Sequence, residues 1–147
     1  AAVALAQLDR WADIKARRGA IRDSYLRKLE GIVQVHPSHK ETITSSLMVK
    51  IKSGSAAALC ARLNEREVAA HRTYLPPLYT HPFFAGLECV NGNGESVPAD
   101  RRGIDMAGAA EMEKSVLGLP FHPFLTDEEI DQIIGVLCDT LKQPMKG

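Results

Sequence analysis

The sequence predicts an α+β fold, in which a small sheet of about three strands is covered on one face by helices and a long helix stands at the N-terminus. Three patterns lead to this expectation. Large apolar residues in 1–29 recur mostly at steps of three and four, which is the helical period. Residues 47–52 alternate as a half-buried strand does. Residues 126–141 carry the signals of a capped amphipathic helix.

The composition is that of one globular domain. The chain has 147 residues, 45% of them hydrophobic, and its 18 basic residues balance 18 acidic ones. A nucleic-acid partner is not expected, because neutralising phosphates would need surplus Lys and Arg. A membrane is not expected either, because no apolar run approaches the ~20 residues that cross a bilayer. No signal peptide is visible, and the three widely spaced cysteines indicate no disulfide framework, so a cytoplasmic location is the simplest interpretation.

Residues 1–29 are expected to form one long helix. Its apolar positions are Leu5, Leu8, Trp11, Ile14, Ile21, Tyr25 and Leu29. No Ser, Thr, Asp or Asn precedes them to cap the first N–H groups, which suggests a chain cut from something larger. An ordinary frayed helix is the alternative. Gly31 is the expected stop, because glycine tolerates the left-handed cap conformation.

The next segment is expected to read strand, helix, strand. Leu47, Val49 and Ile51 define the first strand, and Ser55 can cap a helix that runs to about Glu65. Residues 67–75 look like a second strand, which the prolines at 76 and 77 would end.

Residues 76–106 are irregular, with a turn at 91–94 (NGNG). A hairpin around this turn is one option, but its flanks do not alternate, so a surface loop is favoured. A short helix is expected at 106–116, followed by an extended piece at 118–121. Thr126 and Glu129 form a capping box for the last helix, with Pro144 at its end.

No motif encodes a metal or nucleophile site. His36 and His39 are three apart, but zinc needs three or four ligands, so no metal is expected. Cys60 and Cys138 lie on apolar helix faces, where a thiol is inert filling. Gly-rich phosphate loops and the common hydrolase and metalloprotease motifs are missing, and no catalytic residue is assigned.

The segment 72–84 (RTYLPPLYTHPFF) has the residues most suited to ligand binding. Arginine recognises phosphate or carboxylate, and Tyr and His can donate hydrogen bonds while their rings stack. Prolines would fix their directions. The alternative, equally supported, is a proline-stiffened loop that packs its aromatic residues on the core.

Three blocks of the chain resemble the C-terminal portion of the DegT/DnrJ/EryC1/StrS aminotransferases. Residues 1–29 (AAVALAQLDRWADIKARRGAIRDSYLRKL) are similar to the family's "AA-x-GLAQL…RR…Y…L" helix. Residues 59–84 (LCARLNEREVAAHRTYLPPLYTHPFF) are similar to its "L…I-x-TR-x-Y-x-PPLH" passage, and residues 117–137 (LGLPFHPFLTDEEIDQIIGVL) to its "LPL-x-P-x-LT-x-EEI-x-x-VI" ending. The order and spacing of the blocks carry the resemblance.

The resemblance implies a reaction and also what is missing. Members of the family are enzymes that hold pyridoxal phosphate (PLP) as a Schiff base on a lysine and aminate nucleotide-linked keto sugars, usually with glutamate as donor. The motifs for that lysine, for the aspartate beside the pyridine nitrogen and for the stacking ring do not occur here. The chain is therefore expected to be a linking helix (1–31) plus the small C-terminal domain (32–147), inactive and without PLP when alone. Its partners would be an N-terminal large domain, the nucleotide-sugar and a second subunit of a homodimer.

The resemblance also assigns candidate substrate-binding residues. Arg72 matches the Arg of the family's "TR" pair, with His71 in place of Thr, and Tyr74 matches the following aromatic residue. Tyr79 stands where many members have the His of "PPLH", and His81 follows. These four residues, Arg72, Tyr74, Tyr79 and His81, are expected at the substrate edge, next to a variable loop at 87–103.

Two alternatives to a fragment of an enzyme remain open. The chain could be a stand-alone, non-catalytic binding or interaction module that keeps the small-domain fold, because fold does not fix function. It could also be part of a competent enzyme whose other half is a separate chain.

Overall fold

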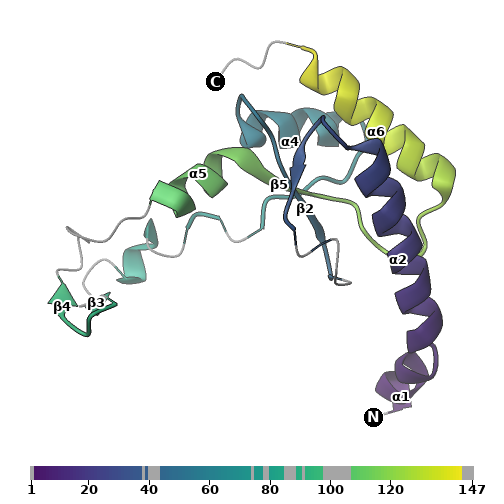
Figure 1. Ribbon diagram of the computed structural model, residues 1–147, viewed down its shortest axis with the longest axis horizontal. Helices are drawn as coiled ribbons and strands as arrows, with labels where there is room; N and C mark the ends of the chain where they lie inside the picture. The colour runs from purple at the N-terminus through teal and green to yellow at the C-terminus, as the bar shows by residue number, and fades with distance from the viewer. Residues whose placement is uncertain are drawn as a thin grey trace.

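The computed structural model describes residues 2–37, 39, 44–73, 75–77, 80–84, 89–90, 92–97 and 107–143. Its centre is an antiparallel sheet of three strands, in the order β1 (Gln34–Val35), β2 (Leu47–Lys50) and β5 (Val116–Leu119). The sheet, covered by helices, confirms the α+β prediction (Figure 1).

Alternation decides which face of the sheet is buried. In the register of β2 and β5, Leu47 lies opposite Leu119 and Val49 opposite Leu117, and all four side chains are buried. They pack against the helices α2 (Trp11–Lys28), α4 (Ala56–Glu65) and α6 (Asp127–Leu141), which supply Ile21, Tyr25, Leu29, Leu59, Leu63, Ile130, Ile133 and Leu137. Helix α6 contacts both α2 and α4, whereas α5 (Ala107–Ser115) extends away from α6 (Figure 1).

The long N-terminal helix is present but interrupted. Helix α1 (Ala2–Asp9) ends one residue before α2 begins, and Arg10 stands between them. The predicted apolar stripe divides a little further along, within α2, because Ile21, Tyr25 and Leu29 are buried whereas Leu5, Leu8 and Trp11 are exposed. Gly31 has a φ of +75°, which confirms it as the residue where the chain turns away.

Both predicted helix caps are confirmed. The Ser55 hydroxyl accepts a hydrogen bond from the Ala58 amide at 3.3 Å and so starts α4. The Thr126 hydroxyl accepts from the Glu129 amide at 3.1 Å, and the Glu129 carboxylate accepts from the Thr126 amide at 2.8 Å. This capping box starts α6, and Ala107–Ser115 confirms the helix expected at 106–116.

The strand predicted at 67–75 is wrong. Among the described residues of this segment, His71 alone pairs with the sheet, through an isolated bridge to Gly118 with N···O distances of 3.0 and 2.7 Å. Glu67 has a φ of +63°, which turns the chain out of the extended conformation after α4. The Asn64 amide also donates to the Ala70 carbonyl at 2.9 Å, so this backbone is tied to the end of α4 instead of to a neighbouring strand.

The surface loop favoured around the turn at 91–94 is also wrong, because the alternative, a short hairpin, stands there. Strands β3 (Cys89–Val90) and β4 (Ser96–Val97) pair antiparallel around a turn in which Gly94 has a φ of +81°. The hairpin lies apart from the three-stranded sheet, beyond α5 (Figure 1). Much of the variable segment 87–103, and Pro144, lie outside the described residues.

Within the described residues, no helix combines the length and the apolar character that crossing a bilayer requires.

Candidate functional site

The segment predicted to bind substrate leaves the sheet at His71. A Cβ atom at Gly118 would overlap Cε1 and Nε2 of the His71 ring and lie 3.0 Å from Cδ2, so the ring rests directly on this glycine. Because Leu117 and Leu119 point into the core, position 118 faces the opposite side of the sheet. The His71 ring therefore covers the outer face of β5. A glycine within a strand pattern is the sequence signal that could have revealed this contact.

Arg72 is anchored to the end of α5. Its Nη2 donates to the Glu113 carbonyl, which belongs to the last turn of that helix. Such carbonyls lack a partner within their own helix, and the negative end of the helix dipole favours a cation there. Nε of Arg72 is buried and has no hydrogen-bond partner among the described residues. The Arg72 guanidinium is thus held through Nη2, while its buried Nε–H has no acceptor among the described residues.

His81 is held by a separate, local turn. The Phe83 amide donates to Nδ1 of His81 at 3.2 Å, which assigns the ring proton of the neutral form to Nε2. Thr80 donates from its amide and its hydroxyl to the Pro77 carbonyl, at 2.8 Å each. His81 and Phe83 are exposed on η2 (Pro82–Phe84) and the turn before it. Tyr74 and Tyr79 lie outside the described residues.

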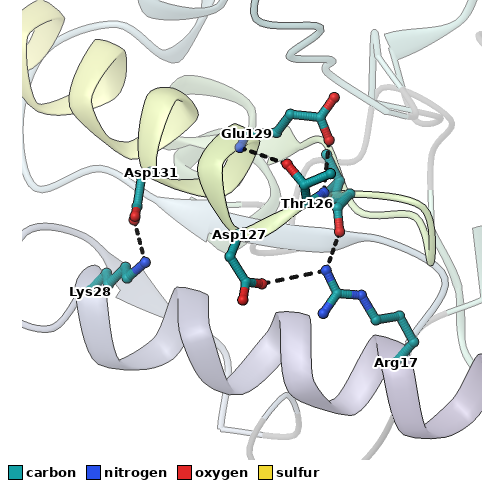
Figure 2. A network of polar contacts seen from close by, with 7 residues as sticks. Arg17, Lys28, Thr126, Asp127, Glu129 and Asp131 are labelled. Atoms are coloured by element: carbon teal, nitrogen blue, oxygen red, sulfur yellow. Dashed lines mark hydrogen bonds and ion pairs between the residues drawn. The ribbon is translucent and has the colours of Figure 1, made fainter.

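A second polar network joins α2 to the start of α6 (Figure 2). Nη2 of Arg17 donates to the Leu125 carbonyl and lies 3.4 Å from a carboxylate oxygen of Asp127. The middle of α2 therefore meets the start of α6 through Arg17, and the C-terminal end of α2 meets α6 through the ion pair of Lys28 with Asp131. Between them the buried hydroxyl of Tyr25 donates to the Pro120 carbonyl at 3.0 Å, and burial strongly raises the pKa of this phenol.

A buried histidine lies beside the start of β2. The Thr44 hydroxyl donates to the Ser46 carbonyl at 2.6 Å, so it accepts from Nδ1 of His39 at 3.1 Å. Burial, and then the nearby charge of His36, lower the pKa of His39. Nη1 of Arg18 donates to the Thr44 carbonyl at 2.9 Å. No group of three His, Cys, Asp or Glu side chains that could hold a metal forms within the described part of the chain.

The described lysines lie on the surface of the domain, most of them in polar contacts. Lys28 and Lys142 pair with aspartates, Lys50 pairs with Glu111 at 2.6 Å, and Lys52 donates to the Gly31 carbonyl. Lys15 and Lys114 are exposed. Cys60 and Cys138 are free thiols packed half-buried on the core, as expected.

Comparison with known proteins gives a single answer. The DegT/DnrJ/EryC1/StrS aminotransferase family matches residues 1–138. A DegT/DnrJ/EryC1/StrS aminotransferase from Brucella abortus superposes with a TM-score of 0.70 and 21% identity, over 92% of this chain and 33% of its own. Helicobacter pylori PseC, an aminotransferase of pseudoaminic acid biosynthesis, superposes with a TM-score of 0.71 and 14% identity, over 94% of this chain and 35% of its own. S. venezuelae DesV, solved with a ketimine intermediate, superposes with a TM-score of 0.71 and 20% identity, over 97% of this chain and 36% of its own.

The chain thus spans about a third of the length of these structures. At such identities the likeness shows the fold alone. No protein with curated annotation matches the chain.

Proposed function

Because the chain belongs to the DegT/DnrJ/EryC1/StrS aminotransferase family, we propose that it acts as the C-terminal domain of a PLP-dependent sugar aminotransferase, where it closes one side of the active site. The observation that carries this proposal is the family match over residues 1–138, combined with structures of sugar-pathway aminotransferases three times as long. The large domain of that enzyme would hold PLP, which supplies an electron sink for amino transfer. The substrate would be a nucleotide-linked keto sugar and the donor glutamate, in a cytoplasmic homodimer.

The role proposed for this chain is to bind and orient the substrate. Arg72, Tyr74, Tyr79 and His81 would line the substrate edge. Arg72 is supported by its chemistry, because its buried Nε lacks a described acceptor and arginine binds carboxylate and phosphate oxygens best. Anchoring at the Glu113 carbonyl would fix the direction of the guanidinium before substrate arrives.

The size of the native polypeptide and its activity test the main proposal. An antibody against this domain should detect a protein about three times the 16.1 kDa of this chain in source cells. The purified native protein, supplied with PLP and glutamate, should release 2-oxoglutarate when a nucleotide-linked keto sugar is added. A native band at 16.1 kDa that binds ligand without turnover would instead favour the stand-alone binding module.

Substitution of Arg72 tests the substrate edge. In the native enzyme, Arg72→Lys should lower kcat/KM for the sugar substrate at least tenfold, because a lysine cannot bond to the α5 carbonyl and to a ligand in the same fork geometry. Arg66→Lys is the matched control, since Arg66 lies against Asp139 and Thr140 on α6. Equal kinetics for the two variants would remove Arg72 from the substrate edge.

A further inference from the structure

From Arg17 onward, α2 is fixed to the rest of the domain. Ile21, Tyr25 and Leu29 are at most 1% exposed in the core. The polar contacts of Arg17 and Lys28 with α6 hold both ends of this stretch (Figure 2). Because these contacts come from successive turns of α2, this stretch and the sheet move as one body.

The backbone at Arg10, before this stretch, lacks a capping side chain and regular helical geometry. Arg10 has φ −96° and ψ 4°, its side chain provides no cap, and α1 leaves the axis of α2 there (Figure 1). Helix α2 begins at Trp11, and the Ile14 amide makes its first turn bond to the Arg10 carbonyl at 3.0 Å. The amides of residues 11–13 are the first-turn amides, which an α-helix leaves without a partner of its own. Trp11, Ala12 and Asp13 are also exposed.

Helix α1 is built to be covered by another body. Its exposed side chains include Val3 (77%), Leu5 (60%) and Leu8 (66%), and a helix with so little polar surface is normally buried. The matched aminotransferases are three times as long as this chain, so the occupant that fits is the large domain of the same enzyme.

We propose that the break between Asp9 and Arg10 is a hinge, on which this domain turns relative to a large domain that holds α1. Hinges are commonly a few residues at the end of an element, where φ and ψ can change without loss of packing. The fixed body begins at Arg17 and carries His71 and Arg72 with it, through the bridge to Gly118 and the bond to the Glu113 carbonyl, so a turn at Arg10 would move Arg72 toward or away from the active site. This inference rests on the proposed function.

Distance measurements on the native enzyme test the hinge. One spin-label pair joins the two sides of the break, at Gln7→Cys and Gln132→Cys, in a background where the native cysteines are replaced by serine. The matched pair, Ala20→Cys and Gln132→Cys, lies within the proposed rigid body, and both of its positions are exposed. The first pair should give a broad distance distribution that narrows or shifts when PLP and glutamate are added, while the second stays narrow and unchanged.

A narrow, unchanged distribution for the pair across the break would overturn the hinge, as would equal widths for the two pairs. Hydrogen exchange gives a second readout without labels. The amides of residues 11–13 should exchange at least tenfold faster than those of residues 21–25, and equal protection would mean one continuous rigid helix. Release of 2-oxoglutarate is measured in a separate assay. A protein that releases none, but has a broad distance distribution for the pair across the break, would refute the proposed function and still support the hinge.

Discussion

Gly118 decides whether the segment that begins at His71, proposed to bind substrate, can rest on the sheet. The His71 ring occupies the space that any other residue at position 118 would need, and the bridge between the two residues is the only strand-like pairing in the described part of 67–75. A close approach of this kind depends on a partner 47 positions away in the sequence (71 to 118). It sets where Arg72 begins and therefore where its guanidinium can reach.

Gly118→Ala should destabilise the chain by about 1–3 kcal/mol, the usual range for overpacking. The added methyl group would force the His71 ring off the sheet. Gly135→Ala is the control, because its Cβ meets nothing within 4 Å on an exposed position of α6, and it should stabilise by up to about 1 kcal/mol. Urea unfolding measures both. If His71→Ala does not recover most of the loss in the double variant, the clash with the ring is not its cause.

His39 should make the stability of the chain depend on pH. Its folded pKa is lowered below the ordinary value of 6.5, so the unfolded chain takes up a proton more readily than the folded one. The contribution of neutral His39 to the free energy of unfolding is complete above pH 6.5. It is lost as the pH falls below 6.5 toward the pKa of His39 in the folded chain. His39→Gln should flatten the pH dependence of the free energy of unfolding between pH 7 and 5. An unchanged slope in His39→Gln would assign the effect to another group.

At the scale of elements, the helices with local start signals and the alternating strand β2 were predictable, and the two-residue strands were not. Ser55 and the pair Thr126 and Glu129 carry their cap chemistry within three residues. Strand β1 has only two residues, too few to show a period, and the strand expected at 67–75 failed because Glu67 turns the chain.

The same limit applies to the candidate site. Arg72 could be selected from its residue type and from the family resemblance. Its bond to the Glu113 carbonyl could not, because that partner lies 41 residues away and becomes its neighbour only through the packing of α5. The contacts of Arg17 with the start of α6 span more than 100 residues and were missed for the same reason.

The cap of α6 should contribute more to stability than the ion pair beside it. Thr126→Ala removes a hydroxyl that accepts the Glu129 amide and should cost about 1 kcal/mol. Asp131→Asn breaks the pair with Lys28, which is open to solvent, and should cost about 0.5 kcal/mol or less. Chemical denaturation of both variants gives the order, and a larger loss in Asp131→Asn would contradict it.

At the scale of the whole molecule, apolar side chains divide into those this chain covers and those it leaves exposed. Leu29, directly after α2, is 1% exposed, whereas Leu8 is 66% exposed on α1. The division falls within the first half of α2, because Trp11 is exposed and Ile21 is buried, so α1 and the first turn of α2 both lie outside the packed domain.

The two leucines should therefore respond differently to truncation. Leu29→Ala should cost about 2–5 kcal/mol in the 147-residue chain. Leu8→Gln should change the unfolding free energy by about 0.5 kcal/mol or less, as is usual for surface positions. In the native enzyme, Leu8→Gln should instead lower stability, because α1 would be covered there. If the cost of Leu8→Gln is the same in both settings, α1 has no covering body.

The exposed indole of Trp11, beside the break between α1 and α2, also provides an intrinsic fluorescence probe of domain docking. Trp11 is the one tryptophan of the sequence and is 54% exposed at the start of α2. Indole emission moves to shorter wavelength as water leaves the ring, so the emission maximum of Trp11 shows whether a large domain covers the break between α1 and α2. Titrating the chain with a separately prepared large domain would show docking as a blue shift, in an assay that needs neither substrate nor cofactor.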